Sequence, residues 1–408
     1  MADNGAQPPD ELDRFSNFFP LPFRVAILLV AGFWGWGINL HYLSLAKIDV
    51  PALIRYPSRS SPHQLTHHQS TYRLATLLSL PLGVFLLLFW IITHGSSERV
   101  QAWEIIPQSY IVLFLVILLF PFHRLSRNGR SRFFASLRRI SVGGLAEAQD
   151  GKFGDVLLAD ALTSYSKVLA EIYINYCMFF SSSESSTGKP DRMCGGRIVV
   201  PLLIAIPYAI RFRQCLIEFF RVRRGGHKSD GWGGQHLANA LKYATSFPVI
   251  IFSNLERNYS QETTHVLSEV TVSRLWALSC FINSAYSFYW DVTKDWDLTL
   301  LSSNTRTWRH QDYPFGLRPR RIFPRDEMYY GVVAIDLILR FTWMSRLSPH
   351  LDKVNNFESG IFLLMFLEIA RRWMWIFFRV ETEWVRSNRG PALDDVLLSD
   401  FNGKFDDD

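Results

Sequence analysis

The residues of this chain that could do chemistry lie inside its most apolar segments. The segment 357–380 is long enough to cross a bilayer as one helix, which needs roughly 20 residues, and it carries Glu368, Arg371 and Arg372 near its middle. Residues three and four apart share one face of a helix. Each charge costs about 2.5–3.5 kcal/mol at mid-bilayer, so all three must face a protein interior or a water-filled cavity. Two arginines against one glutamate leave one positive charge over, which indicates a site for an anion.

Other polar sets lie at similar depth in neighbouring apolar segments: Asp160 with Thr163 and Ser166, Lys242 with Tyr243, Asp291 with Asp295, and Asp336 with Arg340 and Trp343. Intramembrane ionisable residues are functional candidates by default. The structural alternative is that each acid pairs with a base and holds two helices together. A single pair leaves both interpretations open, but several sets in one part of the chain favour a shared hydrated path.

The charge types indicate an anionic ligand. Guanidinium forks match the oxygens of phosphate or carboxylate, and an ammonium group adds a compact charge. We expect basic side chains to bind the anion while acids hold them in place and keep binding weak enough for release; the bases are Lys242, Arg340, Arg371 and Arg372, and the acids are Asp160 and Glu368. Trp343, one turn after Arg340, could be a bulky gate, although aromatic packing is the simpler explanation from the sequence alone.

Enzyme signatures are absent from the sequence, which has no G-x-S-x-G, H-E-x-x-H, Walker A or G-x-G-x-x-G motif. Asp291 and Asp295 form one D-x-x-x-D pair, so a metal-dependent lipid-modifying enzyme is a weaker interpretation. His63, His67 and His68 lie in a polar connector without an acid or cysteine beside them, which is typical of a solvated loop. We expect no catalytic activity, no metal and no cofactor.

Composition places the chain among membrane proteins. It has 408 residues, 48% of them hydrophobic, and a net charge of +6. The basic residues cluster between apolar runs, which favours the positive-inside bias over nucleic-acid binding. Three cysteines (Cys177, Cys215 and Cys280) lie inside apolar runs and Cys194 lies at the edge of one, so we expect no disulfide framework and no zinc site. No cleavable signal peptide is evident.

Hydropathy predicts an all-α polytopic membrane protein of about ten spans. The clear spans are 21–42, 72–92, 103–120, 155–180, 196–220, 236–255, 270–290, 328–346 and 357–380, and the basic segment 131–150 either adds one more or lies at the interface. Three glycines in the first span (Gly32, Gly35 and Gly37) permit close helix approach and could serve a homodimer.

Positive-inside bias predicts which side each connector faces. The basic loops 221–228 and 306–325 and the C-terminal tail fall on one side, which we assign to the cytosol. The N-terminus is then cytosolic with ten spans and lumenal with nine, and the sequon at Asn258 is lumenal.

Several segments together resemble the EXS family: LADALTSYS (158–166), HLANALKYATSF (236–247), YWDVTKDWDL (289–298), ILRFTW (338–343) and LEIARRWMWIFFRVETE (367–383). The family includes phosphate exporters of the retrovirus-receptor type and the short fungal ER-retention-defective proteins. The resemblance implies about ten spans enclosing a polar phosphate pathway. It assigns the pathway to Asp160, Thr163, Ser166, Lys242, Tyr243, Asp291, Arg340, Glu368, Arg371 and Arg372, with Trp343 as the gate. Thr163 stands where relatives often have Asn.

The resemblance also implies an organisation and a location. We expect a short cytosolic N-terminal segment (1–20), N-terminal membrane helices with a basic connector (21–150), the EXS-type core (151–385) and a cytosolic acidic tail (386–408). Long exporters begin with a cytosolic SPX domain, for which the residues before the first span leave no room. The short form implies a Golgi protein that returns phosphate, a by-product of glycosylation, to the cytosol and supports retention of glycosyltransferases and ER residents. The alternative is a non-transporting adaptor for glycosyltransferase recycling.

Overall fold

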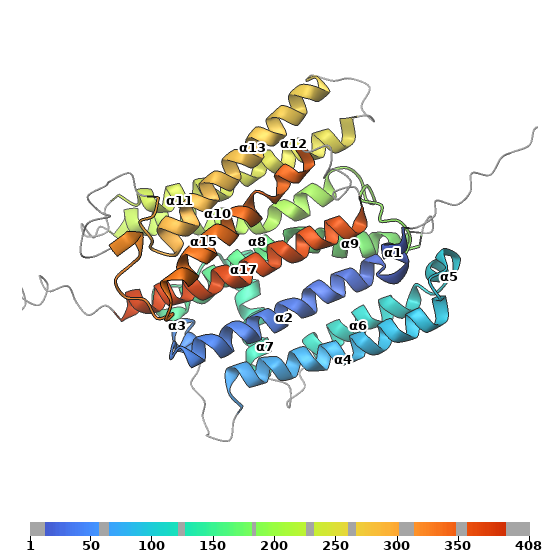
Figure 1. Cartoon of the computed structure of the whole chain (residues 1–408), viewed down its shortest axis with the longest axis horizontal. Helices are drawn as coiled ribbons and strands as arrows, with labels where there is room; N and C mark the ends of the chain where they lie inside the picture. The colour runs from blue at the N-terminus through green and yellow to red at the C-terminus, as the bar shows by residue number, and fades with distance from the viewer. Residues whose placement is uncertain are drawn as a thin grey trace, which may run out of the picture.

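The computed structural model describes residues 13–56, 65–120, 127–181, 185–225, 232–259, 267–301, 314–347 and 357–388. Every regular element within these ranges is a helix, and most helices run side by side in one elongated bundle (Figure 1). The predicted all-α fold class is therefore confirmed. His63, the first 12 residues, residues 306–313 of the basic loop and the tail beyond residue 388 lie outside the described residues.

Long continuous helices form the frame of the bundle. Three of them are both long and apolar enough to cross a membrane: α2 (Leu21–Leu45), α4 (His67–Thr93) and α10 (Val199–Gly225). The shorter α6 (Ile105–Leu119) is also apolar, whereas α17 (Glu358–Ser387) is long and carries the predicted charges. A capping box formed by Thr66 and Gln69 satisfies the free N–H groups that begin α4.

Other passages are broken part-way along the bundle. A single residue, Tyr165, separates α8 (Lys152–Ser164) from α9 (Ser166–Phe180), and Thr245 separates α11 (Gly234–Ala244) from α12 (Ser246–Asn258). Phe341 separates α15 (Asp326–Arg340) from the 3-10 turn η7 (Thr342–Leu347), and α13 (Glu269–Trp290) ends in the π turn η5 (Asp291–Asp295). Each break frees backbone groups that must find partners inside the protein.

Continuous and broken passages together number nine within the described residues. They are α2, α4, α6, α8–α9, α10, α11–α12, α13, α15–η7 and α17. The segment 131–150 adds no further one. It forms α7 (Arg127–Arg138), whose 12 residues extend about 18 Å, and the π turn η1 (Arg139–Gly143). Arg130 donates to the last carbonyls of α6, and Arg139 binds Asp155 near the start of α8. These contacts lie at one end of the bundle, and the interfacial alternative remains a prediction.

The glycines of α2 are used inside the chain. A Cβ on Gly35 would lie 2.0 Å from the ring of Trp373 in α17, and a Cβ on Gly32 would lie 2.1 Å from the hydroxyl of Tyr165. The predicted close approach of helices is therefore present, and it packs α2 against the helices that carry the polar sets.

Helices α2 and α17 run parallel to each other. Arg24, in the first turn of α2, donates to Glu358 at the start of α17 (2.6 Å), and Tyr42 meets Phe377 further along both helices. Short α1 (Arg14–Phe18) lies near the start of α17, whereas α17 finishes at the opposite end of the bundle (Figure 1). The cytosolic segment 1–20 and the cytosolic tail 386–408 remain predictions, and both extend beyond the described residues.

The expectation that the cysteines form no disulfide is wrong. Cys177, near the end of α9, is bonded to Cys194 in the connector before α10, and their Cα atoms are 6.1 Å apart. Spacing in the sequence gave no sign of this, because a pair separated by 17 residues matches no local motif. Cys215 and Cys280 are buried and form no disulfide within the described residues.

Candidate functional site

The arginine pair on α17 faces the middle of the bundle. Arg371 donates two hydrogen bonds to Glu368 (2.6 and 3.0 Å), and its Nη1 donates to Asp336 of α15 (3.1 Å). The Asp336 side chain is fully buried. Because Glu368 lies three residues before Arg371, the helix itself sets this contact, whereas the contact with Asp336 joins two helices.

The π turn η5 brings two acids to one lysine. Asp291 accepts a hydrogen bond from Nζ of Lys242 (2.9 Å), and Asp295 accepts another from the same group (3.2 Å). Asp291 also binds the guanidinium of Arg340, and Nη1 of Arg371 lies 3.7 Å from it. Asp291 is therefore the point at which α11, α13, α15 and α17 meet.

A second acid, Asp160 of α8, is held by residues from two other helices. Its Oδ1 accepts hydrogen bonds from Nε of Arg211 in α10 (2.7 Å) and from the hydroxyl of Tyr243 in α11 (2.5 Å). Arg211 also contacts Tyr243 (3.1 Å) and Gln214 (2.6 Å). Both Asp160 and Arg211 are buried, so this group is a desolvated ion pair with its polar atoms well satisfied.

Arg372 differs from the other arginines in its partners. Its Nε donates to the hydroxyl of Ser164 (2.9 Å), its Nη2 donates to Thr163 (3.1 Å), and its guanidinium lies 4.7 Å from the ring centre of Trp375. Ser164 in turn donates to Glu368 (2.7 Å). Arg372 makes no ion pair with any carboxylate of the described ranges, although it is buried.

The remaining predicted residues lie beside this network. Ser166, the first residue of α9, is buried, and Tyr208 of α10 packs against a buried cluster that includes Tyr243. The indole N–H of Trp343 donates to Ser284 of α13 (3.0 Å), in the turn that follows Arg340.

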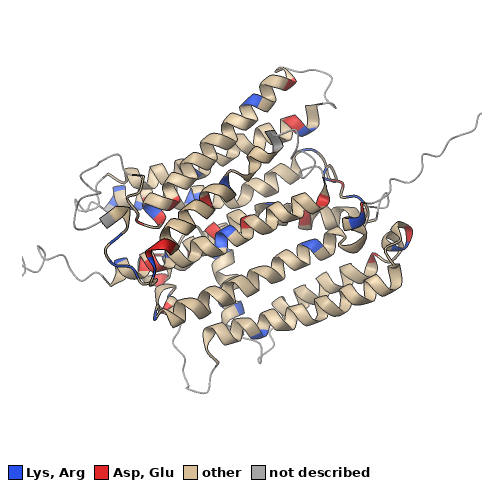
Figure 2. Ribbon diagram, in the orientation of Figure 1, with Lys and Arg blue, Asp and Glu red and all other residues tan. Residues whose placement is uncertain are grey.

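The charges of the site are equal in number. Five acids (Asp160, Asp291, Asp295, Asp336 and Glu368) face five bases (Lys242, Arg211, Arg340, Arg371 and Arg372). The surplus positive charge predicted from α17 alone is thus cancelled by acids on other helices. A local difference in charge remains. The acids lie around Arg371 and Arg340, whereas Arg372 contacts hydroxyl groups. Figure 2 shows these charges in the middle of the bundle, in contrast to the largely uncharged α4.

Sequence spacing found most of this site but not all of it. The structure brings all of the predicted residues into or beside one network, from Asp160 on α8 to Trp343 in η7. Arg211, Ser164 and Tyr208 were missed as site residues. Arg211 lies about half-way along the apolar helix α10, and a buried base in such a position is itself a signal of function.

A helical membrane bundle with discontinuous helices around a buried polar network is an arrangement found in transporters. Comparison with known proteins identifies the family. A model described as "EXS family" matches residues 19–385, and the chain belongs to this family.

Its relatives are of two lengths. Protein ERD1 homolog 1 of Schizosaccharomyces pombe is 33% identical over 93% of this chain and 94% of its own length. Protein ERD1 of Kluyveromyces lactis is 28% identical over 95% of this chain and 99% of its own length. Solute carrier family 53 member 1 of Mus musculus is 27% identical over 93% of this chain, which spans only 52% of that protein.

Proposed function

We propose that this protein passes inorganic phosphate across the Golgi membrane, from the lumen to the cytosol. The phosphate released by lumenal glycosylation would be its substrate, and its recovery would support retention of glycosyltransferases and ER residents. The observation that carries the proposal is the set of partners of Arg372.

A buried guanidinium needs an opposite charge, because uncompensated burial of an ion costs several kcal/mol. Arg340 and Arg371 each have carboxylate partners, whereas Arg372 donates to the neutral hydroxyls of Thr163 and Ser164. Its Nη1 group remains available to donate. Hydroxyls and a guanidinium fork are suitable donors for the oxygens of phosphate.

The charge balance supports passage rather than tight binding. An anion at Arg372 would enter a site whose other bases already have acids, and Glu368 lies beside it. Conduction requires a site that attracts the ion and also releases it. A cluster with an uncancelled excess of positive charge would retain phosphate.

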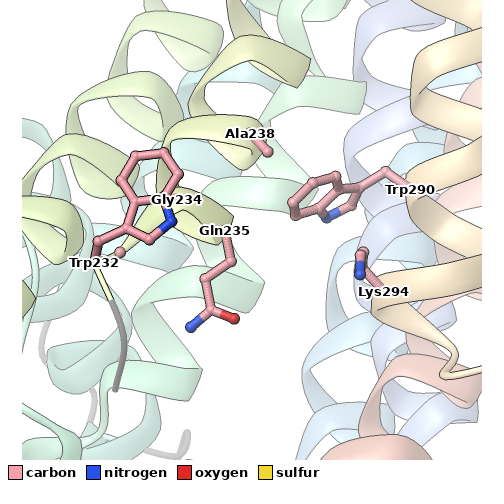
Figure 3. Close-up of a pocket in the computed structure, with 7 residues that line it drawn as sticks. Trp232, Gly234, Gln235, Ala238, Trp290 and Lys294 are labelled. Carbon is pink, nitrogen blue, oxygen red and sulfur yellow. The ribbon is translucent and has the colours of Figure 1, made fainter. Parts of the chain in front are cut away.

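A pocket next to the network supports a route to solvent. It has a volume of about 440 Å³ and is lined by residues that include Trp232, Gln235, Ala238, Trp290 and Lys294 (Figure 3). Ala238 lies one turn before Lys242 on α11, and Trp290 directly precedes Asp291. We assign this pocket to the cytosolic mouth of the pathway.

Two features support this orientation. The end at which α17 finishes carries the basic residues of α7, the end of α10 and the segment 314–325, and positive-inside bias assigns such an end to the cytosol. The Cys177–Cys194 disulfide lies toward the other end, and disulfides persist in oxidising compartments such as the secretory lumen. The tail is then cytosolic, and the N-terminus, together with Arg24 and Glu358, is lumenal.

The relatives support the assignment from two sides. The name of the solute carrier indicates transport, and this chain covers 52% of the length of that protein. The two ERD1 proteins match this chain along nearly their full lengths, which supports a role of the short type in the secretory pathway.

Phosphate flux into proteoliposomes tests the proposal. We expect Arg372→Ala to lower flux at least tenfold, and Arg372→Lys to have an intermediate effect because it keeps the charge but loses the fork. Arg132→Ala is the matched control, since Arg132 is exposed and donates only to a backbone carbonyl at one end of the bundle. Wild-type flux in Arg372→Ala contradicts the assigned site. Purified wild-type protein without flux contradicts transport itself and favours the adaptor alternative.

A further inference from the structure

We infer that Ser284 of α13 is a positioning residue that holds the indole of Trp343 across the pathway. This inference rests on the proposed function, because it concerns how passage through the same site is closed. Ser284 belongs to none of the polar sets that the sequence indicated, and its side chain is buried.

The Ser284 hydroxyl connects two parts of the broken helix α15–η7. Its Oγ accepts a hydrogen bond from Nε1 of Trp343 (3.0 Å) and donates one to the backbone carbonyl of Arg340 (3.0 Å). A serine hydroxyl has one proton to donate and can accept from other groups, so both bonds form at once. Ser284 therefore ties the indole to the residue that binds Asp291.

The break at Phe341 explains why a hydroxyl is needed there. The last carbonyls of a helix have no partner within that helix, and an unsatisfied group is costly where water is excluded. Ser284 satisfies the carbonyl of Arg340. The same oxygen also accepts a hydrogen bond from the indole N–H of Trp343 in the turn η7.

Trp343 lies where the polar part of the helix pair ends. Ser284 and Ser287 on α13 and Asp291 at the start of η5 follow one another at spacings of three and four residues and share a face. About two turns before Ser284 on α13, the contact becomes aromatic, since Trp276 meets the ring of Trp343 edge-on with centroids 6.0 Å apart. The indole therefore closes the end of a polar stripe that starts at the ion network.

This geometry makes the position of the ring depend on one hydrogen bond. A neutral hydrogen bond shifts an equilibrium by about fivefold. If the ring leaves the pathway when this bond opens, removal of the bond raises the open fraction by that factor. Packing against Trp276 remains in either case, so the effect of Ser284 can be separated from that of the aromatic contact.

The test compares Ser284→Ala with Trp343→Phe in the full-length protein in proteoliposomes loaded with radiolabelled inorganic phosphate. We expect Ser284→Ala to raise the rate of phosphate passage about fivefold, and Ser284→Thr, which keeps a hydroxyl, to stay close to wild type. Ser279→Ala is the matched control, because Ser279 lies on the same helix and donates only to the carbonyl of Leu275. In the Trp343→Phe background, which lacks the indole N–H, Ser284→Ala should have no further effect.

Hydrogen exchange of residues 337–347 gives a readout that does not depend on the substrate. Two results together support the proposed role of Ser284, even if wild-type protein passes no phosphate. Exchange is faster in Ser284→Ala than in wild type, and adding Ser284→Ala to Trp343→Phe does not make exchange faster. Lower flux in Ser284→Ala that persists in the Trp343→Phe background overturns it, because Ser284 then acts only through the carbonyl of Arg340. Unchanged flux and exchange in Ser284→Ala also overturn it.

Discussion

Asp160 depends on partners that lie far away in the chain. Arg211 follows it by 51 residues and Tyr243 by 83 residues, yet both contact the same carboxylate oxygen. The carbonyl of Asp160 also accepts from Thr163, which in turn accepts from Arg372. A substitution of Arg211 therefore affects the proposed phosphate site indirectly, through Asp160 and Thr163, although Arg211 does not contact Arg372.

We expect Arg211→Gln to destabilise the protein by about 3–5 kcal/mol, because it leaves a buried carboxylate without its counter-ion. Adding Asp160→Asn to this variant should recover most of the loss, since no unpaired charge then remains. The apparent melting temperature in detergent measures both effects. If the double variant is less stable than Arg211→Gln by the full cost of Asp160→Asn alone, the two residues do not act as a pair.

The sequence predicts the site well where contacts are set by one helix. Glu368 and Arg371 meet because they are three residues apart, and Asp336 and Arg340 because they are four apart. It cannot distinguish Arg371 from Arg372, which are neighbours with very different partners. That difference arises from Asp336 on one side and Ser164 on the other, and no local spacing encodes which helix each arginine meets.

At the scale of elements, α2 is the helix on which the site is supported. Gly35 allows the ring of Trp373 in α17 to lie directly against the α2 backbone, and Gly32 does the same for Tyr165 at the α8–α9 break. Close helix approach at glycine was predicted, but the helices that would approach were not. Both glycines face partners within the chain, so the predicted homodimer, still a prediction, would need a different surface.

Gly35→Ala should destabilise the protein by about 1–3 kcal/mol, because the new methyl group overlaps the indole of Trp373. The matched control is Gly83→Ala in α4, where nothing lies within 4 Å of the added Cβ. There, the better helix propensity of alanine should stabilise by about 0.5–1 kcal/mol. Thermal unfolding in detergent measures both changes, and shifts of the same sign would contradict the close contact.

The helix breaks explain what hydropathy missed. Tyr165, Thr245 and Phe341 each interrupt a passage at a single residue, and one residue does not alter an average over a window of about 19. Hydropathy therefore predicts the two segments on either side of each break as one continuous span. The breaks place Ser164 and Ser166 on either side of Tyr165, and they place Arg340 at the last turn of α15.

At the scale of the whole molecule, the two ends of the bundle differ in chemistry. At the end where α17 starts, Arg192 donates to Glu358 and Glu171, two residues from the disulfide cysteine Cys194. Burial alone would lower the pKa of Arg192, but the hydrogen bonds and charges of Glu358 and Glu171 outweigh it and raise that pKa above its usual range. The connector thus stays charged and tied to α17.

The proposed orientation, with α2 and α17 parallel, predicts that the two termini lie in opposite compartments. We expect a glycosylation tag fused to the N-terminus to receive a glycan in cells and the same tag at the C-terminus to remain unmodified. Both fusions should carry Asn258→Gln, which removes the one natural sequon. Its side chain is only 2% exposed in the fold, so its own glycosylation would be a poor reporter. Endoglycosidase shifts on gels measure the outcome. A glycan on the C-terminal fusion alone would reverse the proposed direction of the pathway. A glycan on both fusions, or on neither, would contradict the odd number of passages.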